Sequence, residues 1–214
     1  IPQIKQLPKF PKMPPLGIIT ITETTVAKAC NKVRGGAGLG GTNALSLQQW
    51  CLRFGKVSKA LRIEIAHFAS WLAMDNPPWA AYRAMMASRL IALGKGDQRG
   101  IRPIGIGDVL KRLIAKCVLE DTREEATESC GSMQLCSGLR GGIEGGIHAA
   151  HQAYQSMISE SPEEHGFLLI DARNAFNELS RITMLWVTRH LWPSGATFLF
   201  NTYKHWSQLF LRVD

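Results

Sequence analysis

The sequence lacks the features of a membrane protein, of a disulfide-stabilised secreted domain and of a zinc module. It has no uninterrupted apolar run of about 18 residues or more and no signal peptide, so nothing in it indicates a membrane segment. Its cysteines number five, an odd and scattered set without Cys-x-x-Cys spacing. Neither a disulfide framework nor a zinc site follows from such a set, and we expect an intracellular, reduced protein.

Acidic residues are also scarce. The 214 residues include 17 acidic and 25 basic side chains, which gives a formal net charge of +8 and an isoelectric point near 9.5. The excess of basic residues is concentrated in one part of the chain. Residues 95–116 contain six basic and two acidic residues, whereas residues 120–128 contain five acidic residues and one arginine. A basic block of this kind suits a polyanionic partner but does not identify one.

Proline is concentrated at the start of the chain, and the pattern predicts three successive regions. Residues 1–21 carry five of the ten prolines and no periodic apolar pattern, so we expect an extended linker there. Residues 22–160 show apolar residues at helical spacing, interrupted by a strand-like segment, and residues 161–214 begin with another strand-like segment. The expected fold class is α+β, with most of the helices in its first part. Ser58 and Ser180 are the expected N-caps of two of the helices, and residues 208–211 predict a short strand.

Glycine is clustered at two places. Residues 36–41 satisfy the letters Gly-x-Gly-x-x-Gly, but they follow a predicted helix rather than a strand, so we predict a flexible loop and not a dinucleotide site. Residues 138–146 precede another predicted helix, whose first backbone amides could hold phosphate oxygens. His148 and His151 follow on that helix, and without a third ligand we expect packed or surface histidines rather than a metal site.

Residues 89–104 predict a β-hairpin. Two apolar strands, residues 89–93 and 101–104, flank a loop that contains three glycines. Pro103 restricts the second strand to the edge of a sheet or to its end, because proline cannot donate a ladder hydrogen bond.

A helix is predicted directly after this hairpin. Asp108 is its expected N-cap, and its apolar residues share one face. The opposite face carries Lys111, Arg112 and Lys116. Three cations without acidic neighbours form either a solvated surface or a set of contacts to phosphates.

Residues 166–177 carry the strongest chemical signal in the chain. The unbroken apolar run at residues 167–170 predicts a strand that is buried on both faces. Asp171 follows directly and would lie at the strand's end, where a buried carboxylate needs a nearby cation because an unpaired one costs several kcal/mol. Phe176 comes five residues later. On the residues alone, Asp171 could equally cap the turn that follows it.

The pattern Asp-x-x-x-Ala-Phe after an apolar strand resembles the first metal-binding motif of reverse transcriptases, especially those of non-LTR retrotransposons. The preceding segments also occur in the order found in that family: the hairpin with Arg-Pro-Ile at residues 102–104, the cationic helix, and the glycine-rich residues 138–142. The resemblance covers roughly residues 22–214. It implies a helix-rich fingers subdomain with a β-hairpin, leading into the start of a polymerase palm sheet at residues 161–214.

The resemblance implies a nucleotide site. Asp171 would bind catalytic Mg²⁺ in the intact polymerase, and Phe176 would exclude a ribose 2′-hydroxyl. Arg102 would grip the triphosphate through two oxygens at once, with Lys95 as a second contact from the same hairpin.

A nucleic-acid site is implied as well. Arg140 would contact the template or the nucleotide, and the three cations of the helix after the hairpin would contact nucleic acid. The implied partners are an RNA template, a DNA primer and deoxynucleotides. A nuclear or ribonucleoprotein-associated location would suit such a protein.

One departure from the family is decisive. Reverse transcriptases carry a later Tyr-x-Asp-Asp-type strand with further catalytic carboxylates, but after Asp171 the only aspartate is Asp214, and no two aspartates are adjacent. We therefore expect a fragment of an RNA-directed DNA polymerase that lacks a complete two-metal site by itself. Two alternatives remain open: a non-catalytic basic nucleic-acid-binding module from a truncated or decayed element, and a helical interaction domain without a nucleic-acid role.

Overall fold

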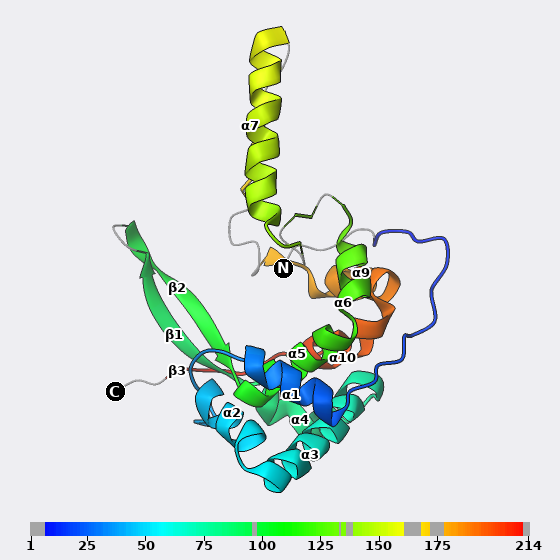
Figure 1. Ribbon diagram of the computed structural model, residues 1–214, viewed down its shortest axis with the longest axis vertical. Helices are drawn as coiled ribbons and strands as arrows, with labels where there is room; N and C mark the ends of the chain where they lie inside the picture. The colour runs from blue at the N-terminus through cyan, green and yellow to red at the C-terminus, as the bar shows by residue number, and fades with distance from the viewer. Residues whose placement is uncertain are drawn as a thin grey trace.

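The structure is a computed structural model that describes residues 7–95, 98–132, 134–135, 139–160, 168–171 and 178–211. Within those ranges the chain forms nine helices and one small sheet (Figure 1). The predicted α+β class, rich in helices, is therefore confirmed for this part of the chain. None of the helices in these ranges is long and apolar enough to span a membrane.

Five helices and the base of the hairpin form the body of the molecule. These helices are α1 (Glu23–Lys32), α2 (Ala44–Leu52), α3 (Gly55–Met74), α4 (Trp79–Met86) and α5 (Val109–Asp121). Three of them begin at a side-chain cap, because Thr22, Asn43 and Asp108 each accept a hydrogen bond from a backbone N–H of the first turn. Such a bond satisfies an amide that has no partner within the helix. The predicted cap at Asp108 is confirmed.

The start of α3 differs from the prediction. Ser58 was expected to be its N-cap, but the helix begins at Gly55 and its N-cap is Phe54, four residues before Ser58. The Ser58 hydroxyl lies inside the first turn, where it accepts from the backbone N–H of Phe54 at 2.8 Å and donates to the carbonyl of Trp50 at 2.6 Å. Ser58 therefore connects the end of α2 to the start of α3.

The hydrophobic core lies between these helices. α5 packs against α1 and α3, and α3 also packs against α2 and α10 (Pro193–Tyr203). The largest fully buried apolar side chains come from α1, α3, α4 and α5 and include Val26, Leu72, Met86, Leu113 and Ile114. The helical spacing of the apolar residues places them on the faces that meet, as the sequence predicted.

A three-stranded sheet lies at the edge of this body. Its order is β2 (Gln98–Gly107), β1 (Ser88–Lys95), β3 (Leu209–Leu211), with β1 antiparallel to β2 and parallel to β3. The predicted hairpin and the predicted strand at the C-terminal end are thus confirmed. Pro103 lies on β2, an edge strand, which is the position that its missing N–H requires.

The remaining helices are α6 (Arg123–Cys130), α7 (Gly142–Glu160), α9 (Arg181–Leu191) and α10. α9 begins at its predicted cap, Ser180, and packs against α10. α10 is anchored by Asn201, which is fully buried and donates to the carbonyls of Leu72 and Asp75, both at 2.8 Å. α7 extends away from the body (Figure 1), and its apolar residues are exposed.

The N-terminal segment is extended, as predicted, but it packs along the body. No helix or strand occurs from residue 7 to Thr22. Trp186 of α9 donates its indole N–H to the carbonyl of Pro8 at 2.7 Å, and the Phe10 ring stacks on His190 with centroids 4.3 Å apart. Ile19 and Ile21 are buried in the core. The segment therefore covers α9 and part of the core, which a free linker would not do.

Candidate nucleic-acid interface

The β1–β2 hairpin carries the residues predicted to grip a nucleotide. Arg102 lies on β2 directly opposite Leu93, and its side chain is exposed. Lys95 ends β1 and pairs with Gln98, after a shift of register that follows Gly94. Figure 1 shows the hairpin extending outward from the helical body. Arg102 is therefore held on a paired strand and is accessible to a large polyanion.

One face of the hairpin presents more than one cation. Directly opposed residues point to the same face of a sheet, and so do alternate residues of one strand. The register pairs Arg89 with Ile106 and Leu93 with Arg102, so Arg89 shares the face of Arg102. Across residues 88–107 the sequence has four basic residues and one acidic residue. The hairpin therefore has a net positive charge, and Arg89 and Arg102 place two of its cations on one face.

Arg89 was expected to begin the first strand of the hairpin, but it was not predicted to be a site residue. It is half-buried at the base of the hairpin, and its Nε is a buried atom without a hydrogen-bond partner in the described part of the chain. Alternation along β1 places it on one side of the strand, but its relation to Arg102 depends on the register between the strands. That register is known only once the hairpin has folded, so the positions of Arg89 and Arg102 on one face could not be predicted from β1 alone.

The glycine-rich loop at residues 35–41 packs against the base of the hairpin. A Cβ on Gly38 would lie 2.7 Å from the Cα of Asp108, and one on Gly40 would lie 2.7 Å from its Oδ2. Only residues without a side chain permit this approach. The loop follows α1 and not a strand, so the context of a dinucleotide site is absent, but the loop is a packed connection rather than the flexible one predicted.

Arg112, predicted to contact phosphates, holds this loop. Its guanidinium donates to the carbonyls of Arg34 at 2.6 Å and Gly36 at 2.5 Å. Lys111 and Lys116 are half-buried, and burial lowers the pKa of Lys111. The cationic face expected on α5 is therefore partly covered, with one of its three cations occupied by the protein's own backbone.

Arg140 lies exposed in the turn that precedes α7. The glycines beside it were predicted to allow a close approach of backbone to a ligand. In the structure the close approach is to the chain itself, because a Cβ on Gly142 would lie 1.9 Å from the carbonyl oxygen of Leu135. Gly141 has a φ of +68°, which suits glycine. His148 and His151 are exposed on α7, as expected for surface histidines.

The buried strand predicted before Asp171 is wrong for the residues that the structure describes. Leu168, Leu169 and Ile170 form no strand and are 84%, 91% and 84% exposed. Their apolar run predicts burial only if a second strand and a covering layer are present, and the described sheet contains β1, β2 and β3 alone. Asp171 is exposed and has no ion pair among the described residues. Phe176 lies outside the described residues.

The described residues do not complete a magnesium site. They contain no group of three or more His, Cys, Asp or Glu side chains that could hold a metal ion. Asp171 is the one predicted metal ligand among them, and a two-metal site needs several carboxylates on a rigid support.

No family model, curated protein or solved structure matches the chain. The candidate interface is therefore defined by residues of this chain alone. These are the exposed Arg102, the half-buried Arg89 on the same face of the hairpin, and Arg140 before α7.

Proposed function

We propose that the chain contains the fingers region and the start of the palm of an RNA-directed DNA polymerase of retrotransposon type. The order of its motifs supports this proposal, and so does one structural observation. A two-stranded arm extends from the helical body and carries Arg102 exposed, on a face that it shares with Arg89 (Figure 1). Guanidinium groups suit this position because they bind phosphate oxygens in pairs and stay charged at every physiological pH.

Each proposed residue has a role in the intact polymerase. Arg102, with Lys95, would bind the triphosphate, and Arg140 would contact the template. Asp171 would be one ligand of Mg²⁺, and Phe176 would favour deoxynucleotides over ribonucleotides. Since the described residues do not complete a metal site, catalysis would require further carboxylates. Template RNA and primer DNA would be the macromolecular partners, and a nuclear or ribonucleoprotein-associated location would follow.

The first test is binding of the chain to a fluorescent RNA-template/DNA-primer duplex, followed by anisotropy at increasing salt. Log affinity should fall with log salt by close to one unit per phosphate neutralised. Arg102→Ala should weaken binding and reduce the salt slope by about one unit. Arg53→Ala is the matched control, because Arg53 is an exposed arginine at the end of α2. Salt-independent binding, or equal losses in both variants, would contradict the proposal.

A second test separates a polymerase from a non-catalytic binding module. The two differ in whether the chain, once joined to the remaining carboxylates, extends a primer. In a polypeptide that also supplies the remaining carboxylates, a polymerase should extend the primer, and Asp171→Asn should abolish extension without weakening duplex binding. Arg102→Lys should chiefly raise the deoxynucleotide concentration required for extension. A lysine ammonium cannot form the paired hydrogen bonds with which an arginine guanidinium binds two phosphate oxygens. Full extension by the Asp171→Asn protein would exclude Asp171 from the site.

A further inference from the structure

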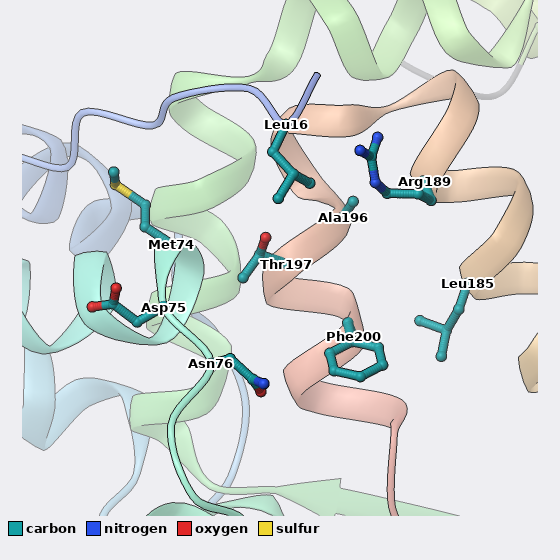
Figure 2. A pocket seen from close by; sticks show the side chains of 9 residues that line it. All are labelled: Leu16, Met74, Asp75, Asn76, Leu185, Arg189, Ala196, Thr197 and Phe200. Atoms are coloured by element: carbon teal, nitrogen blue, oxygen red, sulfur yellow. The ribbon is translucent and has the colours of Figure 1, made fainter. Parts of the chain in front are cut away.

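A pocket lies between α9, α10 and the end of α3 (Figure 2). Its volume is about 310 Å³, at the lower end of the roughly 300–1,000 Å³ typical of small-molecule sites. Most of its wall is apolar and comes from Leu16, Met74, Leu185, Ala196 and Phe200 (Figure 2). Such a wall binds a hydrocarbon body by removing it from water.

Arg189 supplies the cation of this pocket. Figure 2 shows its side chain extending from α9 toward Ala196 and Leu16. Its Nη1 is buried and has no hydrogen-bond partner, and Arg189 forms no ion pair within the described ranges. A buried donor of a charged group without an acceptor is costly, and native proteins seldom retain one without a reason. The Nη1 atom itself lies below the pocket's surface, but the same guanidinium lines the pocket, and no carboxylate of the described residues neutralises it.

Asp75, the carboxylate among the described residues that line the pocket, does not neutralise Arg189. Asp75 is exposed, and in Figure 2 its carboxylate is turned away from Arg189 and Phe200. At the opposite end Asn76 accepts a hydrogen bond from the Lys204 ammonium at 2.7 Å. Burial lowers the pKa of Lys204, whose Nζ lies 5.2 Å from the centre of the Phe200 ring. Arg189 therefore lines the cavity itself, whereas Lys204 contacts Asn76 and Phe200 of its lining and lines the neighbouring hollow.

We propose that this pocket binds an organic monocarboxylate with an aliphatic or aromatic body. The carboxylate accepts hydrogen bonds from Arg189, with the hydroxyl of Thr197 on the same wall, and the body lies between Leu185 and Phe200. A single negative charge fits a single unpartnered guanidinium, whereas a phosphate dianion would require more donors than this wall provides. This site is independent of the function proposed for the hairpin.

A second hollow adjoins the pocket at Leu185 and Phe200. That hollow has a volume of about 420 Å³ and shares Leu185 and Phe200 with the first. Ile182 and Trp206 contribute to its wall. We expect the alkyl chain of a ligand whose carboxylate is at Arg189 to extend toward this second hollow. Affinity should rise with chain length by roughly three- to fourfold for each methylene that is buried.

The experiment is isothermal titration of the full chain with a series of straight-chain carboxylates from hexanoate to decanoate. Decanol and decylamine serve as neutral and cationic analogues of the same length. We expect affinity to increase along the series and decanoate to bind at least tenfold more tightly than either analogue. No binding of decanoate up to about 1 mM, or equal binding of decanol, would overturn the proposal, because the first leaves no site and the second leaves only an apolar cavity.

A matched pair of variants tests the cation. Arg189→Gln should weaken decanoate binding at least tenfold and leave decanol binding unchanged, whereas Arg53→Gln, far along the chain and outside the pocket, should change neither. Unchanged decanoate binding by a folded Arg189→Gln protein would overturn the proposal. Circular dichroism checks the fold of both variants. If a variant does not fold, the comparison of decanoate with decanol and decylamine on the unaltered chain still tests whether the pocket binds a carboxylate.

Discussion

Helices α5 and α7 look alike in the sequence and differ in the structure. Both carry apolar residues at helical spacing. In α5, Leu113 and Ile114 are completely buried, whereas in α7, Ile143 and Ile147 remain 58% and 64% exposed. Periodicity predicts that a helix forms and which of its faces is apolar. Whether that face is covered depends on the elements that the chain folds against it, and most helical stability comes from that cover.

The hairpin shows both situations within one element. At its base, Gly105 lies against Ser88 and Leu209, since a Cβ there would be 3.5 Å and 3.6 Å from their side chains. Toward its tip, Leu93 and Ile101 are exposed. The base of the hairpin is therefore packed against the body of the molecule, whereas its outer part is exposed, as α7 is.

The largest expected effect separates α5 from α7 by stability. Leu113→Ala should lower the free energy of unfolding by about 2–5 kcal/mol, because it leaves a cavity in a closely packed core. Ile147→Ala should change it by no more than about 0.5 kcal/mol. Urea denaturation followed by circular dichroism measures both. Equal losses of unfolding free energy would mean that the apolar face of α7 is covered in solution. The two helices would then not differ in burial.

A smaller effect separates the packed glycine loop from the outer hairpin. Gly38→Ala would bring a Cβ within 2.7 Å of the backbone of Asp108, whereas a Cβ at Gly94 meets no atom within 4 Å. We expect Gly38→Ala to destabilise the protein by about 1–3 kcal/mol through overpacking, and Gly94→Ala to leave the melting temperature nearly unchanged. Thermal unfolding of the two variants tests this. A Gly38→Ala protein as stable as the original would show that the loop is not held against α5.

Local signals in the sequence predicted most of the elements. The caps Asp108 and Ser180, the hairpin with Pro103 on an edge strand and the strand at residues 209–211 were all predicted correctly. Each depends on chemistry within a few residues: a side-chain acceptor, a glycine-rich loop or a missing N–H. The start of α3 was predicted incorrectly because a serine near a helix start can bond either to its own first turn or to the preceding segment.

The candidate site was less predictable, because its contacts join distant parts of the chain. Arg112 was expected to face phosphates, yet it bonds to the loop of Arg34 and Gly36, more than seventy residues earlier. The apolar run before Asp171 predicted a buried strand, but burial requires partners that the run itself does not encode. The roles of Asp171 and Phe176 remain predictions that only the functional tests address.

The smallest effect concerns charge within the body, where Glu120 joins α5 to α1. Its carboxylate accepts hydrogen bonds from the ammonium of Lys32 and from Arg123, the latter at 3.3 Å. The hydrogen bond from Lys32 is the main reason that the pKa of Glu120 lies below its ordinary value of 4.5. A carboxyl whose pKa is lowered by folding stabilises the folded state above its unfolded pKa, and that contribution is lost as the pH falls through the folded value.

Unfolding free energies should therefore fall more steeply below about pH 4.5 in the original protein than in Glu120→Gln. At pH 7 the variant should lose no more than about 1 kcal/mol, because Lys32 is 47% exposed and water screens the pair. Glu144→Gln on α7 is the matched control, since Glu144 forms no ion pair within the ranges that the structure describes. It should keep the acid dependence of the original. If Glu120→Gln has the same slope below pH 4.5 as Glu144→Gln, the contact between α1 and α5 does not depend on the charge of Glu120, and apolar packing alone holds these helices together.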